Sequence, residues 1–179
     1  MTHPLRACIV VFASLIASAG CASSPTPASV PNTIPPVSGT PRDLGNIRVI
    51  DIVDGNGASY APRKCIYTHY TGWLADGTKF DSSRDSSRSG IVGEPVGFAQ
   101  GRKQVIDAWD TGFDGMRVGG TRRLFVPWRM GYGARGNPPV IPSRSDLVFD
   151  VALVAVADTL PHRSGPAVCP EWRTVRPRG

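Results

Sequence analysis

The chain has 179 residues, of which 41% are hydrophobic and 19% charged, with a formal net charge of +6. This length suits one globular domain with tails, and the composition excludes a wholly disordered chain. The 20 glycines and 17 prolines argue against an all-helical bundle, because proline cannot continue a helix. The basic residues are scattered singly, so no nucleic-acid partner is expected. The sequence contains no run of about 18 apolar residues, so no membrane-spanning helix is expected.

Residues 1–21 have the pattern of an export signal: one positive charge at Arg6, an uncharged stretch, and then small residues. The last four, Ser18-Ala19-Gly20-Cys21, resemble a bacterial lipobox, whereas Ala17-Ser18-Ala19 fits ordinary signal cleavage. We expect lipidation at Cys21 and anchoring to the outer membrane, facing the periplasm or the surface. A soluble periplasmic protein is the alternative.

Residues 22–45 are rich in proline and serine and contain almost no bulky apolar residues. Such a composition is typical of a semi-extended, flexible linker that cannot bury a core. The linker contains no amphipathic stretch that could form a dimerisation helix, so a monomer is expected. The sequence from 46 to 158 predicts the folded domain, and residues 159–179 form a basic, turn-rich C-terminal extension.

Within residues 46–158, alternating apolar residues predict a strand over 47–52 that ends at a glycine-rich turn. A β-branched and aromatic run predicts a strand over 65–74, and the turn signal Asp76-Gly77 returns it as a hairpin through 78–82. Apolar spacing of three and four residues predicts a short helix over 105–113.

Two more strands are expected over 121–126 and 146–157, joined by a Gly/Pro loop. Together these elements predict an α+β fold, in which a curved antiparallel β-sheet, a half-barrel, wraps around one short α-helix.

Two motifs suggest cofactor or metal chemistry and fail for physical reasons. The run from Gly131 to Gly136 matches a dinucleotide fingerprint, but Pro138 and Pro139 prevent the helix that such a fingerprint needs. Cys65 and His69 lie four residues apart on one predicted strand, and two ligands do not make a zinc site. No cofactor and no metal are therefore expected.

Four blocks of sequence carry a family resemblance. They are Tyr70-Thr71-Gly72-x-Leu74-x-Asp76-Gly77-x-x-Phe80-Asp81-Ser82-Ser83, Gln104-Val105-Ile106-x-x-Trp109, Tyr132-Gly133-x-x-Gly136-x-Pro138-Pro139-x-Ile141-Pro142 and Leu147-Val148-Phe149-Asp150-Val151. In this order, across nearly all of 46–158, they resemble the FKBP-type peptidyl-prolyl cis/trans isomerases. The resemblance implies a peptidyl-prolyl cis/trans isomerase, and together with the export signal over 1–21 it predicts an enzyme that assists protein folding in the bacterial envelope. It also implies proline-containing polypeptides as partners and macrolides as alternative ligands.

The resemblance further implies a set of site residues. The catalytic set would be Phe80, Asp81, Trp109 and Tyr132, and the substrate-binding set Tyr70, Val96, Val105, Ile106, Ile141 and Phe149. In this family the tryptophan forms the floor of the pocket, the tyrosine donates to a substrate carbonyl, and the isoleucine offers its backbone N–H. Val96 stands where many members place an aromatic residue, so a non-catalytic module that holds proline segments is the alternative function.

Once the signal is removed and Cys21 is acylated, Cys65 and Cys169 remain. An exported compartment permits disulfides. If Tyr70 faces the pocket, strand alternation turns Cys65 to the outer face, where the C-terminal extension could cross. We therefore expect a disulfide between Cys65 and Cys169.

Overall fold

The computed structural model describes residues 33–85, 93–158 and 168–176. Its strands, in chain order, are β1 (Arg42–Leu44), β2 (Ile47–Val53), β3 (Cys65–Leu74), β4 (Lys79–Ser82), β5 (Val96–Ala99), β6 (Thr121–Val126) and β7 (Leu147–Ala157). Its helices are α1 (Asp107–Gly112), the 3-10 turn η1 (Trp128–Met130) and α2 (Trp172–Val175).

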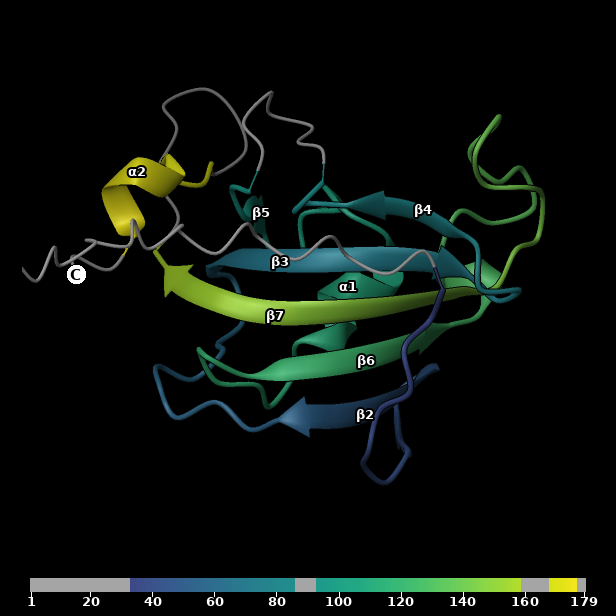
Figure 1. The fold of residues 1–179 in the computed structure, drawn as a ribbon. Coiled ribbons are helices and arrows are strands. Elements are labelled where there is room, and N and C mark those ends of the chain that lie inside the picture. Colours follow the sequence, from purple (N-terminus) through teal and green to yellow (C-terminus); the bar gives the residue numbers. More distant parts are fainter. Residues whose placement is uncertain (1–32, 86–92, 159–167, 177–179) are drawn as a thin grey trace, which may run out of the picture.

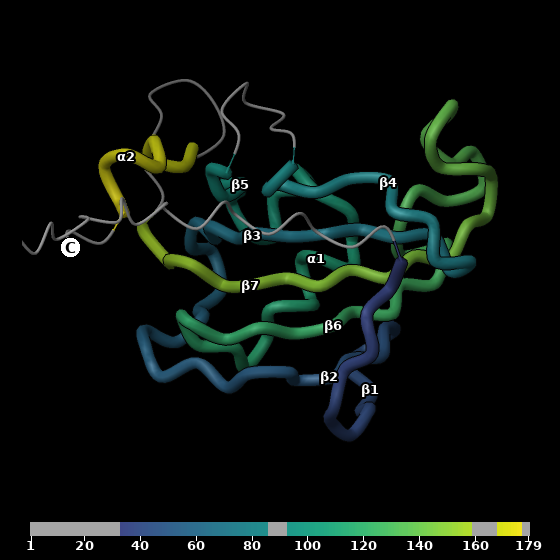
Figure 2. The backbone as a smooth tube through the Cα atoms, viewed as in Figure 1, coloured from purple at the N-terminus to yellow at the C-terminus, as the bar shows by residue number. Residues whose placement is uncertain are grey.

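The strands form one antiparallel sheet in the order β1-β2-β6-β7-β3-β4, and β5 pairs with β3 beyond this path. Figures 1 and 2 show β3, β7, β6 and β2 side by side, with α1 lying behind them. The sheet is open and curls around α1. The predicted α+β fold with a curved antiparallel sheet is therefore confirmed.

The core lies between the sheet and α1. On β7, alternate residues such as Phe149, Val151 and Leu153 are buried on the face toward the helix, as a period of two requires. From α1, Trp109 packs against this face, and Phe113 at the C-cap of the helix is fully buried. Each such side chain contributes roughly 1.5–3 kcal/mol through burial, so these contacts fix the helix against the sheet.

The structure differs from the expected linker between residues 33 and 45. Residues 42–44 form the edge strand β1, which pairs with β2, and Leu44 packs against the core. Farther upstream, the guanidinium group of Arg123 donates to the backbone carbonyl of Pro35 at 2.8 Å. Proline is tolerated beside an edge strand, because only one side of the strand needs donors. The proline-rich composition therefore did not reveal that this part of the segment lies on the sheet.

Three further elements differ from the prediction: two were not predicted, and one begins at a different residue. Strand β5 was not predicted, because its sequence Val96-Gly97-Phe98-Ala99 is short and contains a glycine. Helix α1 begins at Asp107, two residues later than predicted, because Ile106 is extended with ψ of 150° and serves as the N-cap. The short helix α2 lies within the C-terminal extension, where no helix was expected.

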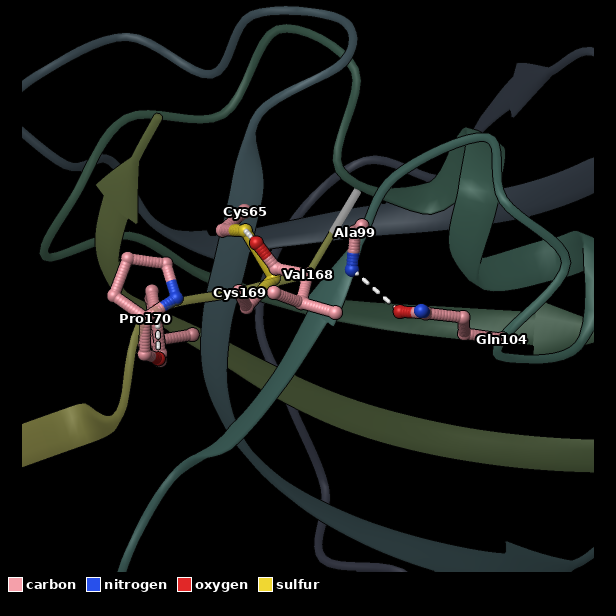
Figure 3. Close-up of a disulfide and its surroundings, with 7 residues drawn as sticks. Cys65, Ala99, Gln104, Val168, Cys169 and Pro170 are labelled. Atoms are coloured by element: carbon pink, nitrogen blue, oxygen red, sulfur yellow. Dashed lines mark hydrogen bonds between the residues drawn. A yellow bond between two sulfur atoms is a disulfide. The ribbon is translucent and has the colours of Figure 1, made fainter. Parts of the chain in front are cut away.

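Residues 168–176 of the C-terminal extension pack on the end of β3. A disulfide joins Cys65 of β3 to Cys169, with the two Cα atoms 5.5 Å apart (Figure 3), and this is the pair expected from the sequence. The Tyr67 hydroxyl donates to the Pro170 carbonyl at 2.6 Å, and the Tyr67 ring lies 5.5 Å from the Trp172 ring. This part of the extension therefore covers a small second cluster of buried residues on β3, β5 and β7.

The expected export signal over 1–21, the Cys21 lipidation site and linker residues 22–32 lie outside the described residues. Within the described ranges, no helix is both long enough and apolar enough to cross a membrane.

Candidate functional site

An aromatic cavity of about 70 Å³ opens between α1 and the inner face of the sheet. Four strands, helix α1 and two loops supply its lining, which consists of Tyr70, Phe80, Asp81, Val96, Gln104, Val105, Ile106, Trp109, Tyr132 and Phe149. The structure thus brings together nine of the ten residues expected to form the site. They come from positions up to 79 residues apart in the chain, between Tyr70 and Phe149.

Trp109 forms the floor of the cavity and is 5% exposed. Its ring makes edge-to-face contacts with Tyr70 and Phe149, at centroid distances of 5.0 and 5.6 Å. The indole nitrogen is buried and has no hydrogen-bond partner among the described residues. Helix α1 aims the ring, because the Trp109 amide donates to the Ile106 carbonyl at 2.9 Å and so starts the first turn. The floor is therefore apolar except for one donor whose hydrogen bond is not made.

Gly72 allows the aromatic walls to close over β3. A Cβ atom at this position would lie 2.6 Å from the Phe80 ring and 2.8 Å from the Phe149 ring. These two rings themselves meet edge to face, at 5.6 Å and an interplanar angle of 88°. Only a residue without a side chain lets both rings approach the strand so closely.

Asp81 supplies the only carboxylate that lines the cavity. One of its oxygens accepts the Tyr70 hydroxyl at 2.5 Å, and the other accepts the backbone N–H of Ser82 at 2.8 Å. Both oxygens thus have donors within the protein. The hydrogen bond from the Tyr70 hydroxyl to Asp81 holds the Tyr70 ring against Trp109.

Two residues depart from the expected site. Ile141 does not line the cavity; it is 2% exposed and belongs to the hydrophobic core, where its backbone closes a tight turn with Asn137. Gln104 lines the cavity but was given no role from the sequence, although it begins a motif that carries the family resemblance. Its side-chain oxygen accepts the Ala99 N–H at 2.8 Å (Figure 3), which ties the end of β5 to the loop before α1.

A larger hollow of about 580 Å³ lies between the β1–β2 turn and the ends of β6 and β7. Its lining contains one aromatic residue, Phe125, and includes none of the residues that surround Trp109. The smaller aromatic cavity is the better candidate, because apolar walls with a few convergent polar groups are typical of ligand sites. The described residues contain no cluster of three or more potential metal ligands.

Comparisons with known proteins point to the same cavity-bearing domain. Residues 57–154 match the family model described as FKBP-type peptidyl-prolyl cis-trans isomerase. An FK506-binding protein of Neisseria meningitidis serogroup A is 45% identical over 113 residues, which cover 63% of this chain and 98% of that protein.

Solved structures give the same likeness. A peptidyl-prolyl cis-trans isomerase from Pseudomonas syringae superposes with a TM-score of 0.57 at 28% identity, covering 66% of this chain and 81% of that one. FkpA from Escherichia coli superposes with a TM-score of 0.54 at 32% identity, and the match covers 63% of this chain and 48% of FkpA.

Proposed function

We propose a specific role for this chain, which belongs to the FKBP-type peptidyl-prolyl cis-trans isomerases: it isomerises X-Pro bonds of folding proteins in the bacterial envelope, using the aromatic cavity. The isomerase activity follows from the family. The observation that carries the assignment of the site is the buried indole of Trp109 beneath a ring of aromatic side chains.

The chemistry of the reaction explains why such a cavity suffices. Rotation about an X-Pro bond breaks amide resonance, with a barrier of roughly 18–20 kcal/mol, and no bond to a new atom is formed. The twisted amide has less charge separation than the planar one. An apolar site that excludes water therefore favours the twisted amide, and every tenfold gain in rate needs about 1.4 kcal/mol of preferential binding.

Individual residues of the cavity have separate roles in this proposal. Trp109 excludes water from below, and Phe80 and Phe149 close the wall beside the proline ring. Tyr132 and the backbone N–H of Ile106 donate to carbonyl oxygens of the bound polypeptide. Asp81 acts through Tyr70, whose hydroxyl it holds at 2.5 Å, and is a positioning residue.

The envelope location rests on the first 21 residues. The lipobox-like end at Cys21 supports a protein anchored by lipid to the outer membrane, with residues 22–32 as the tether. A disulfide between Cys65 and Cys169 fits an oxidising compartment. Its clients would then be polypeptides that fold after export.

Two experiments test the proposal. Exchange between cis and trans X-Pro peptides should be faster with the purified protein than without it; a folded protein that binds the peptide without speeding exchange would instead support a proline-holding module. Fractionation of cells that express Cys21→Ser should show loss of membrane association. A Cys21→Ser variant that stays on washed membranes would refute the anchor.

A further inference from the structure

The loop between β6 and β7 carries an unusual charge distribution. Residues 127–145, called the arginine loop below, contain Arg129, Arg135 and Arg144 and no aspartate or glutamate. All three arginines are exposed, and none makes an ion pair with a described residue. The same loop supplies Tyr132 to the aromatic cavity. Positive charge without a counter-ion therefore lies on the segment that forms one wall of the site.

Two of these arginines lie near the Trp128 ring. The guanidinium carbon of Arg129 lies 4.2 Å from the centre of the Trp128 ring, and that of Arg144 lies 5.9 Å from it. The two cations consequently lie within about one Debye length of each other at 0.1 M salt, where like charges repel. The nearest acidic residue in the sequence, Asp146, uses a carboxylate oxygen to accept the Trp128 backbone N–H at 2.8 Å.

Backbone contacts tie this pair of arginines to the cavity. The Arg144 amide donates to the Gly133 carbonyl at 3.2 Å, and the Gly133 amide donates to the Trp128 carbonyl at 2.8 Å. Tyr132 is the residue next to Gly133. The arginines are thus fixed to the same turn as the tyrosine that lines the cavity, and not to a remote surface.

The cavity is also lined by one carboxylate. Asp81 of β4 accepts the Tyr70 hydroxyl and the Ser82 N–H. The cation of the same strand, Lys79, pairs with Asp85, whereas the arginines of the arginine loop make no ion pair with a described residue. An acidic side chain near the proline would therefore be attracted to the arginine loop.

We propose that the arginine loop is a subsite for Asp or Glu side chains that flank the proline of a client polypeptide. This inference rests on the proposed use of the aromatic cavity, and it adds a substrate class: acidic proline segments are bound and isomerised in preference to neutral or basic ones. Arg129 and Arg144, held together by Trp128, form the centre of the subsite, and Arg135 extends it.

The test uses three peptides with the same Leu-Pro core, flanked on both sides by Glu, Gln or Lys. Exchange NMR measures cis/trans interconversion without a coupling protease, whose own charge preference would confuse the comparison. We expect kcat/KM for the Glu peptide to exceed that for the Gln peptide by about three- to tenfold, as two exposed charge contacts would give. The Lys peptide should be the slowest, and salt of about 0.5 M should compress all three values.

A double variant tests the residues. Arg129→Gln with Arg144→Gln should bring the Glu-to-Gln ratio of kcat/KM close to one. The matched control, Arg173→Gln with Arg176→Gln, removes the same charge from exposed residues of the C-terminal segment, at the other end of the sheet from the arginine loop (Figure 1), and should keep the ratio. An equal loss in both double variants would show an effect of net charge alone and would overturn the subsite.

A binding readout keeps this inference separate from the isomerase activity. The indole N–H signal of Trp128, assigned with Trp128→Phe, should shift on addition of the Glu peptide and not of the Gln peptide. Exchange of all three peptides at the thermal rate would refute the proposed function, whereas equal rates and equal affinities for all three would refute only the subsite. Loss of binding to anionic lipid vesicles in the double variant, with peptide selectivity unchanged, would assign the arginines to the membrane and overturn the proposal.

Discussion

Replacing the floor of the aromatic cavity should separate catalysis from stability. In Trp109→Leu the side chain stays apolar, but the ring that closes the cavity from below is lost. Water then reaches the bound amide and hydrates its planar, more polar form. The preference for the twisted form, on which the rate depends, is consequently reduced.

The structure sets the size of both effects. The Trp109 ring contacts the rings of Tyr70, Phe98, Phe113 and Phe149 at centroid distances of 5.0 to 6.1 Å. Losing these contacts and leaving part of the volume empty should lower the free energy of unfolding by about 2–4 kcal/mol. Small domains are stable by roughly 5–15 kcal/mol, so the variant should remain folded. Loss of the dry floor should lower kcat/KM at least about tenfold, equivalent to about 1.4 kcal/mol.

Phe98→Leu is the matched control. Phe98 is 2% exposed and contacts the Trp109 and Phe113 rings at 5.7 and 5.8 Å, but it does not line the cavity. Denaturant unfolding should show a loss of stability comparable with that of Trp109→Leu, while exchange NMR should show kcat/KM within about threefold of the parent. Equal losses of activity in the two variants would mean that destabilisation explains both, and the desolvation argument would be wrong.

Asp81→Asn supplies the chemical contrast in the same assay. The amide of Asn keeps the size of the side chain and one acceptor for the Tyr70 hydroxyl. In the parent protein this hydroxyl lies 2.5 Å from a carboxylate oxygen of Asp81. If Asp81 only positions Tyr70, this variant should lose less activity than Trp109→Leu, and adding Tyr70→Phe should cost little more. Abolished activity in Asp81→Asn together with a silent Trp109→Leu would instead require an acid–base role.

The remaining predictions concern single groups. Tyr132→Phe should lower kcat/KM by the equivalent of about 1–2 kcal/mol, one hydrogen bond in a dry site, and an unchanged value would remove Tyr132 from the reaction. Cys65→Ser should lower the free energy of unfolding by about 2–4 kcal/mol, because the disulfide to Cys169 closes a loop with a sequence separation of 104. In the unreduced parent protein, mass spectrometry should find no free thiol at Cys65 or Cys169. Burial lowers the pKa of His69 from its ordinary 6.5, and the charge of Arg84 lowers it further, so the unfolded chain binds a proton more readily than the folded one. Stability should therefore fall as the pH drops below about 6.5, and His69→Gln should flatten that part of the profile.

Local sequence patterns predicted the central strands and the helix because the spacing of buried residues within each element follows the period of a strand or of a helix. The strand over 65–74 was predicted with its observed bounds, and the strand over 121–126 likewise. Both have the β-branched and aromatic composition that a half-buried strand needs. Strand β1 was missed although only two residues separate it from its partner β2, because the proline-rich composition around it is typical of a linker. Helix α2 was missed because the groups that hold it, Tyr67 and its neighbours on β3, are distant in sequence.

Most of the residues that line the aromatic cavity were predicted from their motifs, whereas their placement depends on tertiary contacts. Ile141 stands in the same motif as Tyr132, yet one side chain enters the core and the other lines the cavity. The difference arises in the turn, where the Asn137 amide donates to the Ile141 carbonyl at 2.8 Å and directs the isoleucine inward. A motif records which residues recur together and does not record which side of a turn each one faces.

The register of the sheet explains how residues so far apart in the chain form one cavity. Gly72 on β3 pairs with Asp81 of β4 on one side and with Phe149 of β7 on the other. Because side chains on paired positions point to the same face, the Asp81 carboxylate and the Phe149 ring emerge on one face of the sheet. The missing side chain of Gly72 lets the Phe80 and Phe149 rings close over the strand between them. A shift of either neighbouring strand by one residue would turn its contribution to the outer face. The geometry of the cavity is therefore set by strand pairing along the whole length of β3, including the part that the disulfide and the C-terminal segment hold in place.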